Sequence, residues 1–132
     1  RYDGDMDELL AAIDEELSHP NQRVLIVVPT NLERAVLLVE TEKAFEDIEY
    51  VKTLGRLVNQ KTGAFAFIRS GEDTRKDFYS TREESLYYDG FRGFQVHTTI
   101  LLDPTLNRWY HQLCMGCAYA ARLGDNPKVI KL

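Results

Sequence analysis

The 132-residue sequence predicts an α/β fold, a three-layer sandwich whose mainly parallel sheet carries a small antiparallel hairpin. Two patterns predict it. Stretches with helical periodicity alternate with apolar runs of strand length over most of the chain. Two of these runs, within residues 23–29 and 97–103, are almost continuously apolar or β-branched, which is typical of strands buried on both faces of a parallel sheet. Because 44% of the residues are hydrophobic and 28% are charged, we expect one globular domain that spans residues 1–132.

The first third of the chain predicts a helix, a strand and a second helix. Within residues 5–20, apolar side chains recur at helical spacing, acidic residues crowd the start, and a proline closes the end. The buried strand at residues 23–29 follows. Thr30 and Glu33 then form a capping box for a second helix. The apolar stripe predicted for this helix consists of Leu32, Ala35, Val36 and Val39.

Shorter units are predicted in the middle of the chain. Strands are expected at residues 48–54, 56–59 and 64–70. The last two form a hairpin, because the turn between them contains Gly63, which can adopt a positive φ. Residues 71–90 are polar and bounded by glycines, so we expect a loop that contains one short helix at about residues 81–88.

The last third predicts a strand, an amphipathic helix and a final strand. The strand at residues 97–103 ends on an acidic residue, Asp103. The helix is predicted from apolar side chains at helical spacing, which are Leu106, Trp109, Tyr110, Leu113, Cys114, Cys117, Ala118 and Ala121. Gly124 is expected to end this helix in the left-handed conformation, and residues 128–132 are expected to form the last strand.

Charge, apolar run length and cysteine spacing limit the classes of protein that fit. The formal net charge of −5 gives no overall attraction to nucleic-acid phosphates, so contacts with DNA would need a local basic patch. The longest apolar run, residues 24–28, is far shorter than the ~18 residues that a membrane span needs. Cys114 and Cys117 lie three residues apart within a predicted helix, which suits neither a disulfide framework nor secretion. We therefore expect a soluble cytoplasmic protein with no membrane partner.

Three stretches in succession carry a resemblance to a known family. They are RVLIVVPTNLERAVLL (residues 23–38), GRLVNQKTGAFAFIRSGED (55–73) and YDGFRGFQVHTTILLDP (88–104). Their order is similar to the ATPase core of viral DNA-packaging motors, the terminase large subunits, and more distantly to superfamily 2 helicases. The resemblance covers residues 6–132 and implies a RecA-like fold. It also implies that the Pro-Thr turn after the first strand faces nucleic acid, that the strand ending at Asp103 carries the Walker B acids, and that a viral protein of this kind works in the host cytoplasm.

The phosphate-binding parts of such an ATPase are missing from the sequence. A loop of the form G-x-x-x-x-G-K-[ST] surrounds phosphates with backbone N–H groups and neutralises them with its lysine, but no glycine in this sequence is followed by lysine. Acidic residues occupy the place of that loop, and they would repel a triphosphate. Pro104 stands where the second Walker B acid is expected, and proline cannot activate a water. We therefore expect no ATP hydrolysis and no cofactor on this chain alone, and ATP with magnesium only if a phosphate loop lies upstream of residue 1.

A metal ligand and two groups of binding residues are the candidate sites. Asp103 follows a buried strand, where open α/β sheets place ligand-binding groups, but an Asp before Pro-Thr is also an ordinary helix N-cap. The resemblance implies a nucleic-acid-facing turn made by Thr30, Asn31 and Arg34. An aromatic-rich segment that could hold DNA or a partner adds Arg75, Arg82 and Arg92. This segment could instead fold onto the sheet, with Arg92 paired to Asp89.

A histidine and two cysteines step by three along the last predicted helix. His111, Cys114 and Cys117 could in principle touch a zinc ion, but no fourth ligand is evident and His111 lies off the apolar stripe. A thioredoxin-like redox role needs the first cysteine at a helix N-terminus, whereas these cysteines are in mid-helix. Packed, unreactive thiols are therefore the favoured interpretation.

Three hypotheses for the function remain. The first is a non-hydrolytic relative of the terminase or helicase fold that binds DNA, a partner ATPase or a nucleoprotein assembly. The second is part of an active packaging or helicase ATPase whose phosphate loop lies upstream of residue 1. The third is an unrelated metal-dependent α/β enzyme that uses Asp103 and His97 at the sheet edge.

Overall fold

The computed structural model describes residues 6–72 and 95–132. The described elements follow the order α1 (Met6–Leu17), β1 (Arg23–Val28), α2 (Asn31–Ala44), β2 (Ile48–Val51), β3 (Arg56–Asn59), β4 (Phe65–Ser70), β5 (Thr98–Leu101), α5 (Arg108–Ala118) and β6 (Lys128–Lys131). The short helix expected at residues 81–88 lies outside the described residues, as does most of the loop at 71–90. None of the helices in the described ranges is long and apolar enough to cross a membrane.

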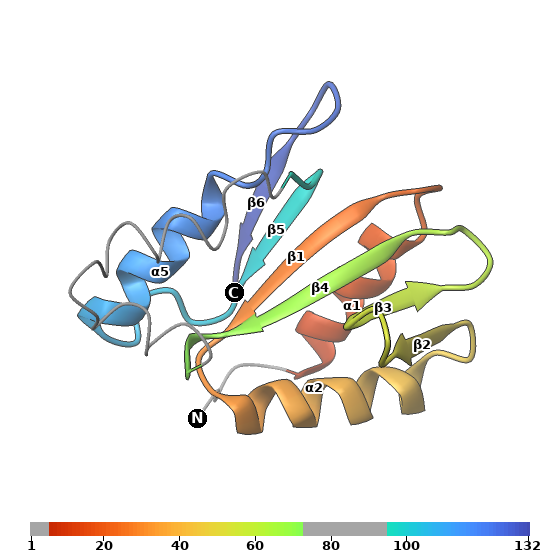
Figure 1. Ribbon diagram of the computed structural model, residues 1–132, viewed down its shortest axis with the longest axis horizontal. Coiled ribbons are helices and arrows are strands. Elements are labelled where there is room, and N and C mark those ends of the chain that lie inside the picture. The colour runs from red at the N-terminus through yellow and green to blue at the C-terminus, as the bar shows by residue number, and fades with distance from the viewer. Residues whose placement is uncertain (1–5, 73–94) are drawn as a thin grey trace.

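One six-stranded sheet runs through the described part of the molecule in the order β2-β3-β4-β1-β5-β6 (Figure 1). β1 pairs in parallel with β4 and β5, and β6 pairs in parallel with β5. β2, β3 and β4 pair antiparallel. The predicted α/β class and the mainly parallel sheet are confirmed, and the antiparallel part extends over three strands rather than over one hairpin.

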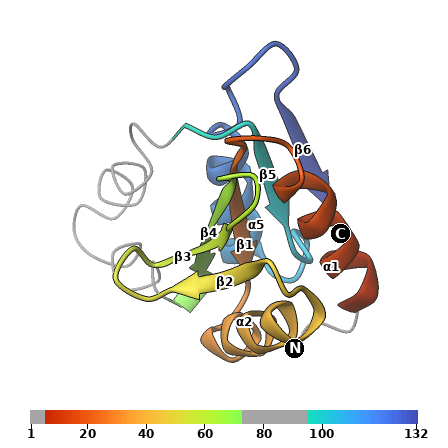
Figure 2. The same ribbon diagram turned by 90° about the vertical axis from the view of Figure 1, so that its right-hand side faces the viewer.

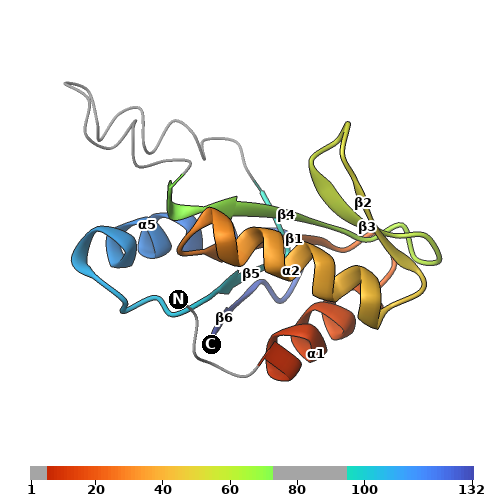
Figure 3. The same cartoon turned by 90° about the horizontal axis from the view of Figure 1, so that it is seen from below.

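Helices cover both faces of this sheet. α1 and α2 pack over a core that includes Ile26 and Leu37, and α5 packs over a second core that includes Leu25 and Leu113. Successive side chains of β1 enter opposite cores because side chains alternate along a strand. Figure 1 shows α5 on one side of the strands with α1 and α2 on the other, and Figure 2 shows α5 behind the strands. In Figure 3, α1 and α2 lie next to each other on the viewer's side of the strands. The three-layer sandwich is confirmed.

Local signals that predicted the hairpin are also confirmed. Gly63 has a φ of 74° in the turn between β3 and β4. Asn59 fixes this turn, because its side-chain oxygen accepts hydrogen bonds from the backbone N–H groups of Lys61 and Thr62 at 2.9 and 3.2 Å. The strand expected at residues 48–54 is shorter and ends at Val51.

The buried face of α2 differs from the prediction. Thr30 is the N-cap, as expected, and its Oγ1 accepts a hydrogen bond from the Glu33 N–H at 3.3 Å. The predicted apolar stripe, however, faces solvent, with Leu32 71% exposed, Val39 55% and Val36 41%. The helix instead buries Glu33, Leu37 and Thr41. Apolar residues occur around much of α2, so helical spacing alone did not determine which side meets the sheet.

The start and end of α5 also differ from the prediction. The N-cap is Asn107, whose side-chain oxygen accepts from the Tyr110 N–H at 2.8 Å, so Leu106 lies outside the helix and is 42% exposed. The predicted stripe is confirmed for the buried residues Tyr110, Leu113, Cys114 and Cys117. The helix ends at Ala118, and Gly124, although its φ is 78°, lies too far along the chain to cap it. The last strand, β6, is confirmed.

Candidate functional site

Three neighbouring parallel strands end at one edge of the sheet. β4, β1 and β5 lie side by side and run in the same direction, so the residues that follow them meet at a common edge. Open α/β sheets bind their ligands at this carboxyl edge. The segments at this edge begin with Gly71, Pro29 and Leu102. Candidate residues Thr30, Asn31 and Asp103 therefore belong to this region.

The turn after β1 is held to the end of β4 by two short hydrogen bonds. Ser70 Oγ donates to Asn31 Oδ1 at 2.6 Å, and the Asn31 N–H donates to Glu72 Oε1 at 2.7 Å. Thr30 Oγ1 donates to Glu33 Oε1 at 2.9 Å in addition to its capping role. The polar groups of this turn are therefore bonded to the protein itself, and the cap interpretation of Thr30 is confirmed.

Arg34 points to a different part of the surface. Its Nη2 donates to the hydroxyl of Tyr50 in β2 at 3.1 Å, and its guanidinium carbon lies 5.9 Å from the centre of that ring. The structure thus brings Thr30 and Asn31 together but turns the Arg34 side chain toward the antiparallel end of the sheet. The other predicted binding residues, Arg75, Arg82 and Arg92, lie outside the described residues.

Asp103 does not cap a helix, so that interpretation is wrong. It has a φ of 46°, the left-handed conformation that Asp tolerates better than most residues. Its N–H donates to the Leu132 carbonyl at 3.0 Å, and its carbonyl accepts from the Leu106 N–H at 3.1 Å. The chain therefore makes a turn here before α5 begins. Asp103 is a half-buried residue at the carboxyl edge, although no group of three or more potential ligands among the described residues could hold a metal ion.

Tyr110 ties the end of this edge to α5. Its hydroxyl donates a bifurcated hydrogen bond to the carbonyl oxygens of Val27 at 3.0 Å and Leu102 at 2.7 Å. Burial, and then the neighbouring Cys114, raise the pKa of the Tyr110 hydroxyl well above its usual value of 10.0. A hydroxyl that stays neutral and donates to two strand ends has a structural role.

The two cysteines are buried and free, as the favoured interpretation predicted. Burial is the main cause that raises the pKa of the Cys114 thiol to about 11 and the pKa of the Cys117 thiol well above 9.0. His111 Nδ1 lies 3.0 Å from the Pro104 carbonyl, and within the described ranges it forms no metal-ligand group with the cysteines. Thiols that stay protonated at neutral pH are poor nucleophiles and poor metal ligands.

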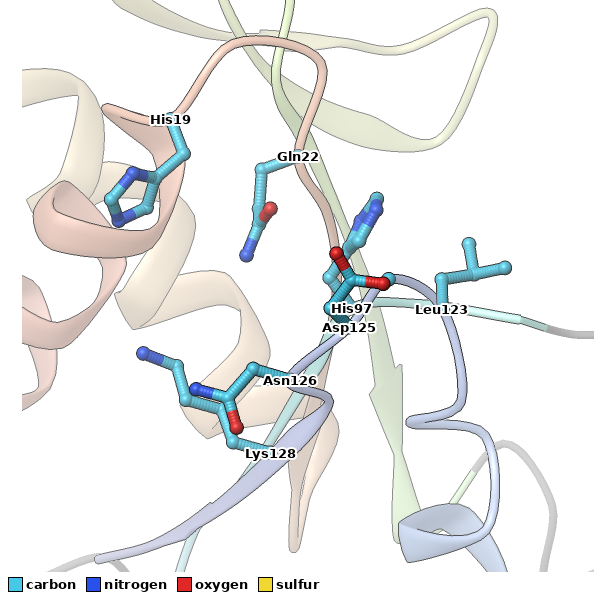
Figure 4. A pocket seen from close by; sticks show the side chains of 8 residues that line it. His19, Gln22, His97, Leu123, Asp125, Asn126 and Lys128 are labelled. Carbon is cyan, nitrogen blue, oxygen red and sulfur yellow. The ribbon is translucent and has the colours of Figure 1, made fainter.

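A polar pocket at the opposite edge of the sheet was not predicted from the sequence. Its volume is about 340 Å³ and its lining residues are His19, Gln22, His97, Leu123, Gly124, Asp125, Asn126 and Lys128 (Figure 4). His97 Nδ1 accepts a hydrogen bond from the Arg23 N–H at 3.0 Å, so the neutral ring carries its proton on Nε2.

A buried ion pair lies beside this pocket. Glu16 of α1 is 1% exposed, and its Oε2 lies 2.5 Å from Lys128 Nζ of β6. Thr98 Oγ1 and Gln22 Nε2 both donate to the other carboxylate oxygen, at 2.6 and 3.0 Å. Glu16 lies three residues after Ile13 on the buried stripe of α1, and this position is the signal that could have identified it.

The structure does not bring together the two residues of the third hypothesis, a metal-dependent enzyme that uses Asp103 and His97. His97 precedes β5 and Asp103 follows it, so the strand separates the two side chains. The four residues of β5 alone correspond to roughly 13 Å at about 3.3 Å per residue. His97 and Asp103 therefore belong to opposite edges of the sheet and cannot share a metal or an acid–base reaction.

Comparison with known proteins supports the fold. No family model matches the sequence, and no curated protein matches it. Among solved structures, the crystal structure of the HK97 bacteriophage large terminase superposes with a TM-score of 0.59 at 12% sequence identity. The superposition covers 99% of this chain and 27% of the terminase chain. The chain thus has a terminase-like, RecA-like fold and spans about a quarter of the terminase's length.

Proposed function

We propose that this chain is a non-hydrolytic, terminase-like module that binds DNA. The observation that carries the proposal is the terminase-like fold over nearly the whole chain, combined with a carboxyl edge that offers a single Walker B carboxylate, Asp103. Pro104 in the next position cannot activate a water, and no Gly-Lys pair occurs in the sequence. The proposed role of this chain is therefore to hold a ligand without hydrolysing ATP.

The predicted DNA contacts form two sets. One is Thr30 and Asn31 in the turn after β1 with Arg34, whose side chain points away from this turn to Tyr50. The other is Arg75, Arg82 and Arg92, which lie outside the described residues. The hydrogen bonds from Ser70 and to Glu72 hold the turn in a defined position, so DNA bound there would have to exchange some of them for its own contacts. DNA is the partner that this proposal expects, with another ATPase or a nucleoprotein assembly as the alternatives, in the cytoplasm, which is that of the host if the protein is viral.

DNA binding is tested by fluorescence anisotropy with a labelled duplex over a range of salt concentrations. We expect affinity to fall as salt rises, because arginine contacts release counterions from the phosphates. Replacement of Arg75, Arg82 and Arg92 by glutamine should weaken binding and reduce the salt dependence. Binding that does not depend on salt, or binding to a protein assembly in the absence of DNA, would replace DNA with a protein partner.

A second candidate function is part of an active packaging ATPase. The observation that favours it is that this chain spans only 27% of the terminase to which it is similar. A phosphate loop from a preceding segment would then complete the site at which Asp103 could organise magnesium. Phosphate release from Mg-ATP discriminates the two functions. Both functions predict none from this chain by itself. With a preceding segment attached, the first function still predicts none, whereas turnover that Asp103→Ala abolishes would establish the ATPase.

A further inference from the structure

One face of the sheet carries arginine and phenylalanine side chains in a compact group. Phe65 and Phe67 alternate along β4 and therefore point to the same face. The strand register places Arg56 of β3 opposite Phe67 and Arg23 of β1 beside Phe65. We refer to Arg23, Arg56, Phe65 and Phe67 as the arginine–phenylalanine face. It lies on the same side of the sheet as α5, next to the core that α5 covers.

The guanidinium groups of this face lie over the aromatic rings. The guanidinium carbon of Arg56 is 4.2 Å from the centre of the Phe65 ring and 5.4 Å from the centre of the Phe67 ring. The corresponding distance from Arg23 to the Phe65 ring is 5.7 Å. The two rings are 5.2 Å apart and nearly perpendicular, at 86°. All four side chains are half-buried, so planar cationic and aromatic groups form one partly accessible surface.

The two arginines of this face have no counter-charge among the described residues. Among the residues that the structure describes, no carboxylate lies within ion-pair distance of Arg23 or Arg56. Their Nε atoms are shielded from water and have no hydrogen-bond acceptor in the described ranges. Lysines elsewhere in the chain do form ion pairs, namely Lys43, Lys61 and Lys128. Two guanidinium groups near one aromatic ring, without a carboxylate partner among the described residues, form a local site for an anionic partner in a chain of net charge −5.

We propose that the arginine–phenylalanine face binds single-stranded nucleic acid. Arg23 and Arg56 contact backbone phosphates, and a base stacks on the accessible part of the Phe65 ring. Single-strand binding proteins combine these two elements, a cationic path for the backbone and aromatic side chains for the bases, and sheet surfaces serve as stacking platforms in the same way. The inference rests on the proposed DNA-binding function and adds the surface and the class of strand.

An acidic peptide is a less suitable ligand for this face. Carboxylates would satisfy Arg23 and Arg56, but they make no use of the aromatic ring between them. A nucleotide supplies both an anion and a planar group of similar size to the ring. If Arg23 and Arg56 only covered the rings of Phe65 and Phe67, the stacking would be explained. The lack of a carboxylate near either arginine among the described residues would not be.

Anisotropy of a fluorescein-labelled 20-nucleotide oligo(dT) titrated with the full chain tests the proposal. The Arg23→Gln/Arg56→Gln double variant should weaken binding by about tenfold or more and lower the salt slope by about 1.4, because each single-strand phosphate contact contributes about 0.7. Phe65→Leu should weaken binding by about tenfold with an unchanged salt slope. The matched control, Lys43→Gln/Lys131→Gln, removes the same charge from α2 and β6 and should bind nearly like the original chain.

The outcomes separate this inference from the proposed function. If the arginine double variant binds oligo(dT) like the lysine control, the arginine–phenylalanine face is not the binding surface. The proposed DNA-binding function would then survive, with contacts elsewhere on the chain. Unchanged oligo(dT) binding by Phe65→Leu would show that no base stacks on this ring. A polyglutamate peptide that competes as well as unlabelled oligo(dT) would identify an acidic partner. Either result overturns the proposal. Failure of oligo(dT) to bind refutes the inference, and a duplex titrated in parallel then decides whether the proposed function survives. Circular dichroism and melting curves check that each variant is folded. If Phe65→Leu does not fold, the Arg23→Gln/Arg56→Gln variant still decides the proposal.

Discussion

The ion pair between Glu16 and Lys128 connects the first helix to the last strand and should contribute measurably to stability. Removing one partner of a buried pair costs about 3–5 kcal/mol, because the other charge stays buried and unpaired. The Lys128 side chain is 45% exposed and that of Glu16 only 1%, so water can partly replace the lysine. We therefore expect Lys128→Met to lower the free energy of unfolding by about 2–3 kcal/mol. Glu16→Gln should cost less, about 1–2 kcal/mol, because Lys128 then returns to water.

Urea unfolding followed by the fluorescence of Trp109, the one tryptophan, measures these changes. A double-mutant cycle of Glu16→Gln and Lys128→Met should give a coupling energy of about 1–2 kcal/mol. Lys43→Met is the matched control, since its 3.8 Å pair with Glu40 is exposed, and it should change stability by less than about 0.5 kcal/mol. A Lys128→Met variant as stable as the Lys43→Met control, or a coupling energy near zero, would refute the reasoning.

The same ion pair predicts a pH dependence. Burial acts to raise the pKa of Glu16, but hydrogen bonds from Lys128, Thr98 and Gln22 outweigh it and hold that pKa below the ordinary value of 4.5. The folded state therefore binds this proton less readily than the unfolded state does. Its contribution to stability is present above pH 4.5 and is lost as the pH falls through the lowered folded-state pKa. The difference between the original chain and Lys128→Met should shrink over that acidic range.

Three further substitutions test local features, each by chemical unfolding. His97→Ala should cost about 1–2 kcal/mol because the Arg23 N–H loses its acceptor, whereas His97→Asn, whose side-chain oxygen can replace Nδ1, should cost clearly less; equal losses would contradict this role. Gly71→Ala should cost about 1–3 kcal/mol, since a Cβ would lie 2.9 Å from the Trp109 ring and 2.8 Å from a backbone oxygen. Thr30→Ala should cost about 1 kcal/mol through loss of the helix cap, with Thr30→Ser close to neutral.

The features that the sequence predicted are those in which one local signal decides the structure. β1 was predictable because its residues after Arg23 are all apolar and all buried, as befits a central parallel strand. The cap of α2 was predictable because Thr30 and Glu33 have the required spacing. In both cases the chemistry of neighbouring residues leaves a single arrangement that satisfies the backbone and buries the side chains.

Features that depend on contacts between distant segments could not be predicted in this way. Leu37 rather than Leu32 faces the sheet because of how α2 packs on the strands, and helical spacing does not determine that orientation. Asp103 has the sequence context of an N-cap, but the bond from its N–H to the Leu132 carbonyl holds it in a turn before α5. Glu16 is buried because Lys128, more than a hundred residues later, lies beside it.

The hydrogen-bonding state of the polar groups supports the proposal of a binding surface away from the carboxyl edge. At that edge, Thr30 and Asn31 already bond to Glu33, Ser70 and Glu72, so a ligand there would have to exchange existing hydrogen bonds for new ones. On the arginine–phenylalanine face the two guanidinium groups lack carboxylate partners among the described residues, so an anion would add contacts without breaking any ion pair. The net gain on binding is therefore larger on that face, even though it is not where the terminase-like fold would place nucleotide chemistry.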